Sequence, residues 1–290
     1  MEAIRLTAPG VEGLRLETVD TPSLGAGEAL VEVHAAAITR DELEWPLDRL
    51  PAVPSYELSG VVAAVADDVG TVSVGDEVFA LTPFDRDGVA AEYAAVPASA
   101  LAPKPSKLSH ADSAAIPLPA LSAWQGLFTH GRLEPGERVL IHGAVGGVGQ
   151  FATQLARWRG AHVIATASPQ SFERARSLGA DEVIDGRNDL RVDALDVIFD
   201  TVGGDIFERA PQLLADGGRL VSVAAEPPDG TYFVVEPSRE QLVELARLAD
   251  DGELRVAIDS TFALADAAAA FERSLASGKR GKVVIRVRGV

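Results

Sequence analysis

The chain has 290 residues, of which 47% are hydrophobic and 24% charged, a composition typical of a globular protein with room for one large or two ordinary domains. Its net charge of −17 argues against nucleic acid as a partner, because nucleic-acid binding depends mainly on Lys and Arg side chains that neutralise phosphates. The absence of cysteine excludes disulfides, thiolate zinc ligands and a catalytic thiol.

Membrane association and metal binding are not expected either. No apolar run approaches the roughly 20 residues that a membrane-spanning helix needs, and the first ten residues, MEAIRLTAPG, lack the features of a secretion signal. We therefore expect a cytoplasmic protein. The five histidines show no i,i+3 or i,i+4 pairing, so no metal site and a metal-independent mechanism are expected.

Short β-type runs broken by Gly and Pro fill the first hundred residues, at 29–38, 58–66, 75–81 and 90–97. Their alternation of apolar and polar positions, with frequent turn residues, predicts a compact and mostly antiparallel β-domain. The Pro- and Ser-rich stretch 104–120 is interpreted as a connector.

Strand and helix patterns alternate beyond that stretch. Strands are expected at 138–142, 162–167, 182–185, 196–200 and 219–224, and helices at 148–159, about 171–178 and 205–214. Val- and Ile-rich strands joined by helices predict a parallel sheet that is covered on both faces. An amphipathic helix is then predicted over 238–254, and the run 281–287 returns to strand character, so the C-terminal residues are expected to rejoin the β-domain.

The stretch HGAVGGVGQ, residues 142–150, lies between a predicted strand and a predicted helix. Ala144-x-Gly146-x-x-Gly149 matches the dinucleotide-binding fingerprint with Ala in the first place. Gly146 and Gly147 would let a diphosphate approach the backbone, Gly149 would let the helix pack closely on the strand, and the helix N-terminus would face the phosphates. The alternative is a tight turn without a ligand.

The end of the next strand bears on which dinucleotide is bound. NAD sites usually carry Asp or Glu there, but this chain reads TASP at 166–169, with no carboxylate until Glu173. The Ser168 hydroxyl could accept a 2′-phosphate and Arg174 could neutralise it, which favours NADPH as the cofactor. Arg174 could equally be a solvated charge on the surface of a helix.

Nine segments, taken in order, resemble the medium-chain dehydrogenase/reductases, and specifically their zinc-free quinone oxidoreductase branch. They are LSGVVAAV, VGDEVFALT, GVAAEYAAVP, AAIPLPALSAWQGLF, VLIHGAVGGVGQFATQLAR, LGADEVID, DVIFDTVGG, GGRLVSVAA and GKVVIRV. The resemblance implies an α/β protein with a GroES-like, mostly antiparallel catalytic domain at 1–114 and 253–290. A Rossmann NADP-binding domain with a doubly wound parallel sheet would be inserted at 115–252. NADPH would lie in the cleft, and a homodimer is expected.

The same resemblance implies roles for individual positions. Gly147 and Val148 match the backbone that contacts the diphosphate, Ser122 a hydroxyl residue near the nicotinamide amide, and Lys282 a loop near the cofactor. Val202, Phe233 and Val235 match stretches that flank the ribose and nicotinamide. The cofactor-binding residues expected on both grounds are Ser122, Ala144, Gly146, Gly147, Val148, Gly149, Ser168, Arg174, Val202, Phe233, Val235 and Lys282.

Three positions depart from the family pattern. Zinc-dependent relatives carry Gly-His-Glu where this chain has Ser-Tyr-Glu at 55–57, so Glu57 is expected to be a structural salt-bridge partner. The Asn-Pro-x-Asp of the branch is replaced by TRDE at 39–42, where Thr39 could supply the polar contact to substrate or nicotinamide. Gly186 stands where many relatives have a Tyr that touches the 2′-phosphate, a departure that counts against NADPH.

Without a metal or a thiol, the simplest chemistry is hydride transfer from NADPH to a quinone or an α,β-unsaturated carbonyl. A simple ketone would need stronger stabilisation of its developing alkoxide. Tyr56, at the position of a zinc ligand in relatives, is a candidate proton donor, and the alternative is a buried tyrosine with a satisfied hydroxyl. Trp45 and Trp124 are interpreted as walls for a flat substrate or as packing, and His142 as structural.

Two other functions stay open at this point. One is a biosynthetic enoyl or ketone reductase that acts on a bulky pathway intermediate. The other is a non-catalytic NADPH-binding protein, which the replaced Asn-Pro-x-Asp and Tyr positions favour.

Overall fold

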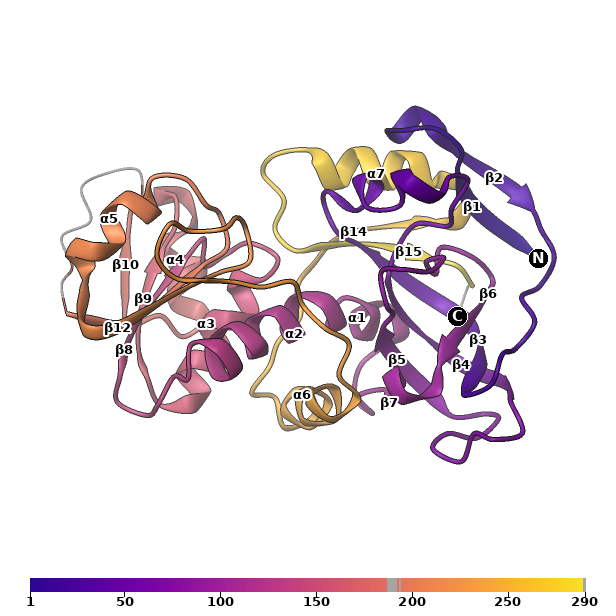
Figure 1. Ribbon diagram of the computed structural model, residues 1–290, viewed down its shortest axis with the longest axis horizontal. Coiled ribbons are helices and arrows are strands. Elements are labelled where there is room, and N and C mark those ends of the chain that lie inside the picture. Colours follow the sequence, from indigo (N-terminus) through magenta and orange to yellow (C-terminus); the bar gives the residue numbers. More distant parts are fainter. Residues whose placement is uncertain (187–191, 193, 289–290) are drawn as a thin grey trace. The chain divides into compact units, whose positions relative to one another are not determined.

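The computed structural model describes residues 1–186, 192 and 194–288 (Figure 1). The chain forms two compact units, Met1–Leu118 with Glu236–Val290, and Pro119–Val235. The first boundary lies close to the predicted 114/115. The second differs from the predicted 252/253 because helix α6 (Arg239–Asp251) packs on strand β7 (Ala102–Pro103) of the unit built from both chain ends. Asp250 at the end of α6 accepts hydrogen bonds from the backbone N–H groups of Ser106 and Lys107.

The unit built from both chain ends contains the predicted antiparallel sheet. Its strands follow the order β14-β15-β3-β4-β5-β7, with β6 paired to β3, and all pairs are antiparallel except β14–β15. The predicted return of the C-terminus is confirmed, since β15 pairs with β3. The strands are β3 (Glu28–Ile38), β4 (Glu57–Val65), β5 (Glu77–Leu81), β6 (Tyr93–Pro97), β7, β14 (Ile258–Ala263) and β15 (Lys282–Arg286). Strands β1 (Glu2–Leu6) and β2 (Leu14–Thr18) form a separate antiparallel pair, and helix α7 (Ala267–Leu275) packs on β14 and β15.

The second unit is the predicted Rossmann domain. Its six strands follow the order β10-β9-β8-β11-β12-β13, and every pair is parallel. The strands are β8 (Arg138–His142), β9 (His162–Thr166), β10 (Glu182–Ile184), β11 (Leu195–Asp200), β12 (Leu214–Ser222) and β13 (Thr231–Tyr232), and the helices between them are α3 (Gly149–Arg159), α4 (Phe172–Ser177) and α5 (Ile206–Leu213). Consecutive residues of β8 and β11 are fully buried, as expected for strands that are covered on both faces.

The stretch 104–120 is not a simple connector, and that interpretation is wrong. It contains helix α1 (His110–Ala114) and the start of α2 (Pro117–Trp124). The Ser109 side chain caps α1 by accepting from the N–H of Asp112, and Pro117 occupies the first position of α2, where proline is tolerated. The Ser and Pro residues therefore begin helices here.

No helix in the described part of the chain combines the length and apolar character needed to cross a membrane.

Candidate functional site

The glycine turn links the end of β8 to the start of α3, as predicted. A Cβ at Gly149 would lie 2.1 Å from the carbonyl oxygen of Gly143, so only glycine allows the helix to approach the strand this closely. A Cβ at Gly146 would be 3.2 Å from the same oxygen, whereas one at Gly147 would meet nothing within 4 Å. Gly147 is exposed and sits just before α3, in which the N–H groups of Gln150 and Phe151 already donate to the carbonyls of Gly146 and Val148.

The chemistry of this turn fits a dinucleotide diphosphate. An exposed backbone without side chains, at the N-terminus of a helix, offers N–H donors and partial positive charge to an anion. Gln150 lies fully buried beneath it, with its Nε2 donating to the Gly147 carbonyl at 3.4 Å. Ala144 is buried with its N–H on the Thr166 carbonyl, and Val148 is the half-buried N-cap of α3.

The end of β9 carries the residues expected to select the cofactor. Thr166 accepts the Gly143 N–H with its Oγ1 at 2.9 Å, so β9 supports the glycine turn. Ser168 is exposed and Arg174 is half-buried on α4. A Cβ at Gly186 would lie 3.1 Å from the Thr166 Cβ, which leaves little room for the tyrosine of other family members.

A buried His–Asp pair lies at the carboxyl edge of the parallel sheet and was missed from the sequence. His142 ends β8 and Asp200 ends β11, and the strand register sets them opposite each other, with Ser222 of β12 on the other side of Asp200. The Asp200 carboxylate contacts His142 Nδ1 at 2.7 Å and accepts from the Ser222 hydroxyl at 2.7 Å and from the N–H groups of Val202 and Gly203.

These contacts explain the ionisation of Asp200 and the shape of the following loop. Burial alone would raise the pKa of Asp200, but the hydrogen bonds from His142, Gly203, Ser222 and Val202 outweigh it and hold the pKa below its ordinary value. The ionised carboxylate therefore fixes the Val202–Gly203 turn. Both residues end strands at the edge where ligands collect in such sheets, which is the sequence feature that could have linked them.

The remaining predicted residues of this unit differ from one another in burial and in their contacts. Val202 is an exposed apolar side chain, with 60% of its surface accessible. Phe233 and Val235 are buried, and the Phe233 ring lies 4.4 Å from the His130 ring. Ser122 is buried on α2. Their contacts with a cofactor stay predictions.

The other unit gathers Thr39, Glu42, Glu57 and Lys282 into one buried cluster, called the Lys282 cluster below. Lys282 Nζ lies 2.5 Å from Glu57 Oε1 and donates to Thr39 Oγ1 at 3.1 Å. The other Glu57 oxygen accepts the N–H of Leu118, the second residue of α2, at 2.8 Å. The expectation that Glu57 is a salt-bridge partner is thus confirmed.

Strand register brings these distant residues together. Glu57 begins β4 opposite Ala37 of β3, and Val283 of β15 pairs with Ile38. Thr39 directly follows β3 and Lys282 begins β15, so both lie one position beyond that pair. Three strands therefore deliver their polar ends to the same corner of the sheet.

Glu42 is the member of the Lys282 cluster that was missed from the sequence. It is fully buried; Oε2 accepts the Thr39 N–H at 2.9 Å, and Oε1 has no hydrogen-bond partner among the described residues. Burial raises the pKa of Glu42 to about 8, against the Thr39 N–H and the Lys282 charge, while the Glu57 and Asp41 charges add to the increase. It occupies the last position of TRDE, where the branch has Asp, and that match was the available indication.

Tyr56 lies in an aromatic group away from any exposed surface. Its side chain is fully buried, its ring centroid lies 5.5 Å from that of Trp45 and 5.4 Å from that of Phe84, and its hydroxyl oxygen accepts from Arg49 at 2.7 Å. Burial raises the pKa of the phenol, with the Arg49 charge opposing it. These contacts agree with the alternative of a buried tyrosine with a satisfied hydroxyl, and a role as proton donor stays a prediction.

Metal ligands do not gather in the part of the chain described: no group of three or more His, Asp or Glu side chains there is placed to hold an ion.

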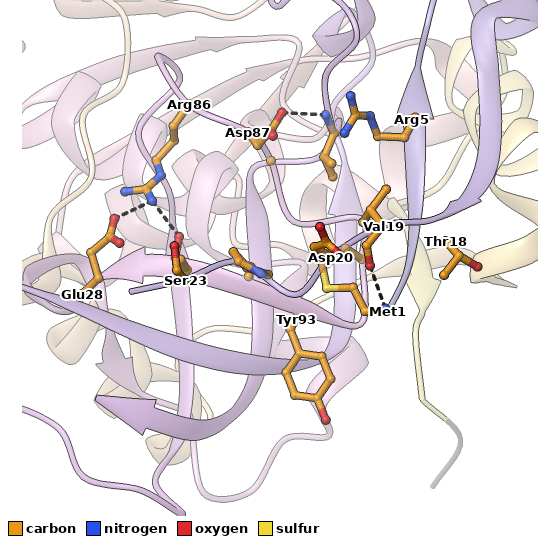
Figure 2. Close-up of a pocket in the computed structure, with 16 residues that line it drawn as sticks. Met1, Arg5, Thr18, Val19, Asp20, Ser23, Glu28, Arg86, Asp87 and Tyr93 are labelled. Carbon is orange, nitrogen blue, oxygen red and sulfur yellow. Dashed lines mark hydrogen bonds and ion pairs between the residues drawn. The ribbon is translucent and has the colours of Figure 1, made fainter. Parts of the chain in front are cut away.

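A cavity of about 810 Å³ lies in the unit built from both chain ends (Figure 2). It is lined by residues of the N-terminal segment, such as Val19 and Glu28, and by Val53 and residues between Arg86 and Ala95, but by none of the predicted site residues. Arg86 pairs with Glu28 at 2.6 Å, which Figure 2 shows, and Asp87 accepts the backbone N–H of Val53. The cavity therefore has no evident connection with the predicted chemistry.

Comparisons with known proteins place the chain in its family. A family model described as "Alcohol dehydrogenase GroES-like domain" matches residues 25–106, and one described as "Zinc-binding dehydrogenase" matches residues 178–285. The chain is 34% identical to a 2-methylene-furan-3-one reductase of Solanum lycopersicum, over 95% of this chain and 76% of that protein. It is 32% identical, with the same coverage, to the chloroplastic NADPH-dependent alkenal/one oxidoreductase of Arabidopsis thaliana. Its structure is similar to that of a quinone oxidoreductase from Coxiella burnetii, with a TM-score of 0.92, 29% identity and 99% of each chain covered.

Proposed function

Because the chain belongs to the medium-chain dehydrogenase/reductase superfamily, in its quinone oxidoreductase-like branch, we propose that it is an NADPH-dependent reductase of quinones or α,β-unsaturated carbonyls. The family consists of nicotinamide-dependent oxidoreductases. The similarity to named reductases over 95% of the chain carries this proposal, and the open backbone at Gly147 supports it independently.

The choice of NADPH over NADH rests on the end of β9. Ser168 is exposed there, and no carboxylate that could repel a 2′-phosphate follows the strand before Glu173. NADPH should bind at least about tenfold more tightly than NADH, a difference of about 1.4 kcal/mol, in a fluorescence titration. Ser168→Asp should weaken NADPH binding and leave NADH binding unchanged; equal dissociation constants in the unsubstituted protein would refute this assignment.

We assign the cofactor-binding residues by the same reasoning. Ala144, Gly146, Gly147, Val148 and Gly149 would hold the diphosphate through the turn and the start of α3. The 2′-phosphate would meet Ser168 and Arg174, and the nicotinamide half would meet Ser122, Val202, Phe233, Val235 and Lys282. A homodimer and a cytoplasmic location are part of the proposal and derive from the family resemblance and the sequence.

When bound, NADPH supplies a hydride. The acceptor gains the hydride at its β-carbon, or at a ring carbon of a quinone, and the displaced π electrons collect as negative charge on its oxygen. A proton from water then completes the reduction. The protein's part is to hold the diphosphate, orient the acceptor and stabilise the oxygen anion.

Steady-state assays with NADPH test this function. We expect NADPH oxidation with 1,4-benzoquinone and with short enones, and none with the corresponding saturated ketones, because only the conjugated acceptors delocalise the incoming charge. Activity should survive treatment with a metal chelator. Tight NADPH binding without oxidation in the presence of any of these acceptors would favour a non-catalytic protein instead.

A further inference from the structure

Only four lysines occur in this chain, and two of them are enclosed beside a carboxylate. Lys104 Nζ lies 3.5 Å from the Glu77 carboxylate. Lys282 Nζ lies 2.5 Å from the Glu57 carboxylate. A carboxylate at this distance favours the protonated ammonium, whose nitrogen has no lone pair left for reaction with an electrophile.

The other two lysines, Lys107 and Lys279, are accessible but differ in their surroundings. Lys107 is exposed, and its charge acts on the neighbouring Asp250 carboxylate. Lys279 is only partly buried, and it forms no ion pair within the part of the chain that the structure describes. Its Nζ donates to the carbonyl oxygen of Ser274, near the end of α7. Lys279 is therefore an accessible amine that no carboxylate holds in its protonated form.

Basic side chains gather around Lys279 at one corner of the antiparallel sheet. Ile38 of β3 pairs with Val283 of β15 at this corner. Arg40 lies two residues beyond Ile38, and Lys279 lies four residues before Val283, in the turn that joins α7 to β15. Arg40 is exposed, and its guanidinium has no hydrogen bond or ion pair with any other residue described. The corner thus carries an unpaired guanidinium as well as an unpaired amine.

The carboxylate nearest to this corner is already engaged. Asp259 of β14 accepts from the Arg273 guanidinium through both of its oxygens, each at 2.7 Å. The backbone N–H of Arg280 donates to the same carboxylate at 2.9 Å. A Cβ at Gly281 would lie 2.2 Å from the Ala257 carbonyl oxygen, so the turn that carries Lys279 packs closely against the neighbouring chain. The turn is therefore fixed in place while Asp259 remains with its own partners.

These surroundings lower the pKa of Lys279 below its ordinary value. Burial is the largest cause, and the positive charges of Arg40 and Lys282 follow. Arg273 adds to the decrease, whereas the Asp259 charge opposes it. More of Lys279 is consequently present as the neutral amine than of an ordinary surface lysine at the same pH, which is the condition for a nucleophilic lysine.

We propose that Lys279 and Arg40 form a site for small anionic aldehydes, in which the Lys279 amine forms an imine with the carbonyl carbon and Arg40 binds the anionic group. Both roles follow from one arrangement, because cations around an amine favour its neutral form and also attract an anionic partner. Phosphate and carboxylate groups suit the planar guanidinium of Arg40, which can bind either through two parallel hydrogen bonds. The site lies entirely within the unit built from both chain ends.

The reaction needs neither an oxidant nor a reductant. The lone pair of the Lys279 amine adds to the carbonyl carbon, and the C=O π electrons pass to the oxygen, which takes a proton. The oxygen then leaves as water with the two hydrogens of the amine, and a C=N bond remains. Before addition, one amine hydrogen can stay on the Ser274 carbonyl while the lone pair is available to the aldehyde.

Pyridoxal 5′-phosphate is a suitable probe, because it combines an aldehyde with a phosphate and its imine absorbs visible light. The full-length protein is treated with it in the absence of NADPH, the imine is reduced with borohydride, and the labelled lysines are identified by mass spectrometry. Lys279 should be labelled at least about tenfold faster than Lys107, the effect of one charge-assisted hydrogen bond to the phosphate. Equal rates at the two lysines would overturn the proposal.

Two variants test the amine. Lys279→Arg keeps the positive charge and should remove most of the visible imine absorbance, whereas the matched control Lys107→Arg should leave it unchanged. The labelling rate of Lys279 should also reach its plateau at a lower pH than that of Lys107, because less alkali is needed to form the neutral amine. Unchanged absorbance in Lys279→Arg, or coinciding pH profiles of the two lysines, contradicts the assignment.

The role of Arg40 is tested with a second aldehyde. Pyridoxal lacks the phosphate but has the same carbonyl group. Arg40→Gln should slow the labelling of Lys279 by pyridoxal 5′-phosphate about tenfold more than its labelling by pyridoxal, because only the first probe loses a charge-assisted contact. An equal loss of rate with both aldehydes would mean that Arg40 does not bind the anionic group.

This inference and the proposed function fail separately. Imine formation takes place without NADPH, so a protein that never oxidises NADPH would refute the reductase and leave the labelling of Lys279 as expected. A protein that reduces enones but labels Lys279 no faster than Lys107 would refute the aldehyde site alone.

Discussion

Replacing Glu42 by Gln should stabilise the protein relative to the unsubstituted chain, and this difference in unfolding free energy should grow as pH rises from about 4.5 to about 8. The Glu42 side chain is fully buried, and its Oε1 has no hydrogen-bond partner among the described residues. Gln has the same size and keeps a carbonyl oxygen for the Thr39 N–H, which now bonds to Glu42 Oε2 at 2.9 Å. The substitution therefore removes the titration and little else.

The magnitude follows from the pKa of Glu42, which is about 8 in the folded protein against an ordinary value of 4.5. Between these pH values the folded protein keeps a proton that the unfolded chain releases. The contribution of Glu42 to stability is therefore complete below about pH 4.5 and is lost as pH rises through 8. The loss amounts to about 1.4 kcal/mol per pH unit, or roughly 5 kcal/mol in all. Gln does not titrate and escapes it.

The assay is urea unfolding at several pH values from about 5 to about 8, for both proteins. Trp45 reports on the right unit, because its ring lies 5.0 Å from that of Phe84 and 5.5 Å from that of Tyr56. Both proteins would carry Trp124→Phe and Trp158→Phe so that Trp45 alone fluoresces. A difference in unfolding free energy between the two proteins that stays constant with pH would mean that Glu42 is ionised in the folded protein. The assignment of Glu42 as a neutral acid would then fail.

Three further predictions concern the Rossmann unit. Gly147→Asp should fold normally, because a Cβ there meets open space, yet lose NADPH binding through repulsion of the diphosphate; an unchanged Kd in a fluorescence titration would contradict this. Gly149→Ala should destabilise the protein by roughly 1–3 kcal/mol, because its Cβ would lie 2.1 Å from the Gly143 carbonyl oxygen, and a melting temperature equal to that of the unsubstituted protein would disprove the close packing. Asp200→Asn removes the charge that accepts from His142 and the following turn, and should cost roughly 1.5–3 kcal/mol in urea unfolding and weaken NADPH binding. Unaltered unfolding and binding would show that the pair holds nothing in place.

The sequence predicted the parts whose physics is local. Buried strands of an α/β unit read as continuous apolar runs, and the alternation with helices requires a parallel sheet, so the Rossmann unit could be inferred from pattern alone. Gly149 is equally local, since the strand–turn–helix junction is only a few residues long. The Pro- and Ser-rich stretch 104–120 misled the interpretation because those residues serve both loops and helix starts, and only the surrounding packing distinguishes the two.

The position of the second boundary along the chain could also be found only from the structure. Helix α6 is amphipathic in the sequence, but the pattern does not say which sheet its apolar face covers. Its contact with β7, and the bonds from Asp250 to the 106–107 backbone, assign it to the unit built from both chain ends.

The Lys282 cluster shows where sequence reasoning reaches its limit. Thr39 and Lys282 are 243 positions apart, and a single hydrogen bond joins them because β15 returns antiparallel to β3. The sequence by itself determined which residues can form strands, turns and helices, and that a charged side chain is expected at the surface. Only the tertiary structure decided that Glu42 is enclosed beside an ammonium, because register and burial depend on contacts between distant segments. Burial in turn is what raises the pKa of this carboxyl group well above its ordinary value.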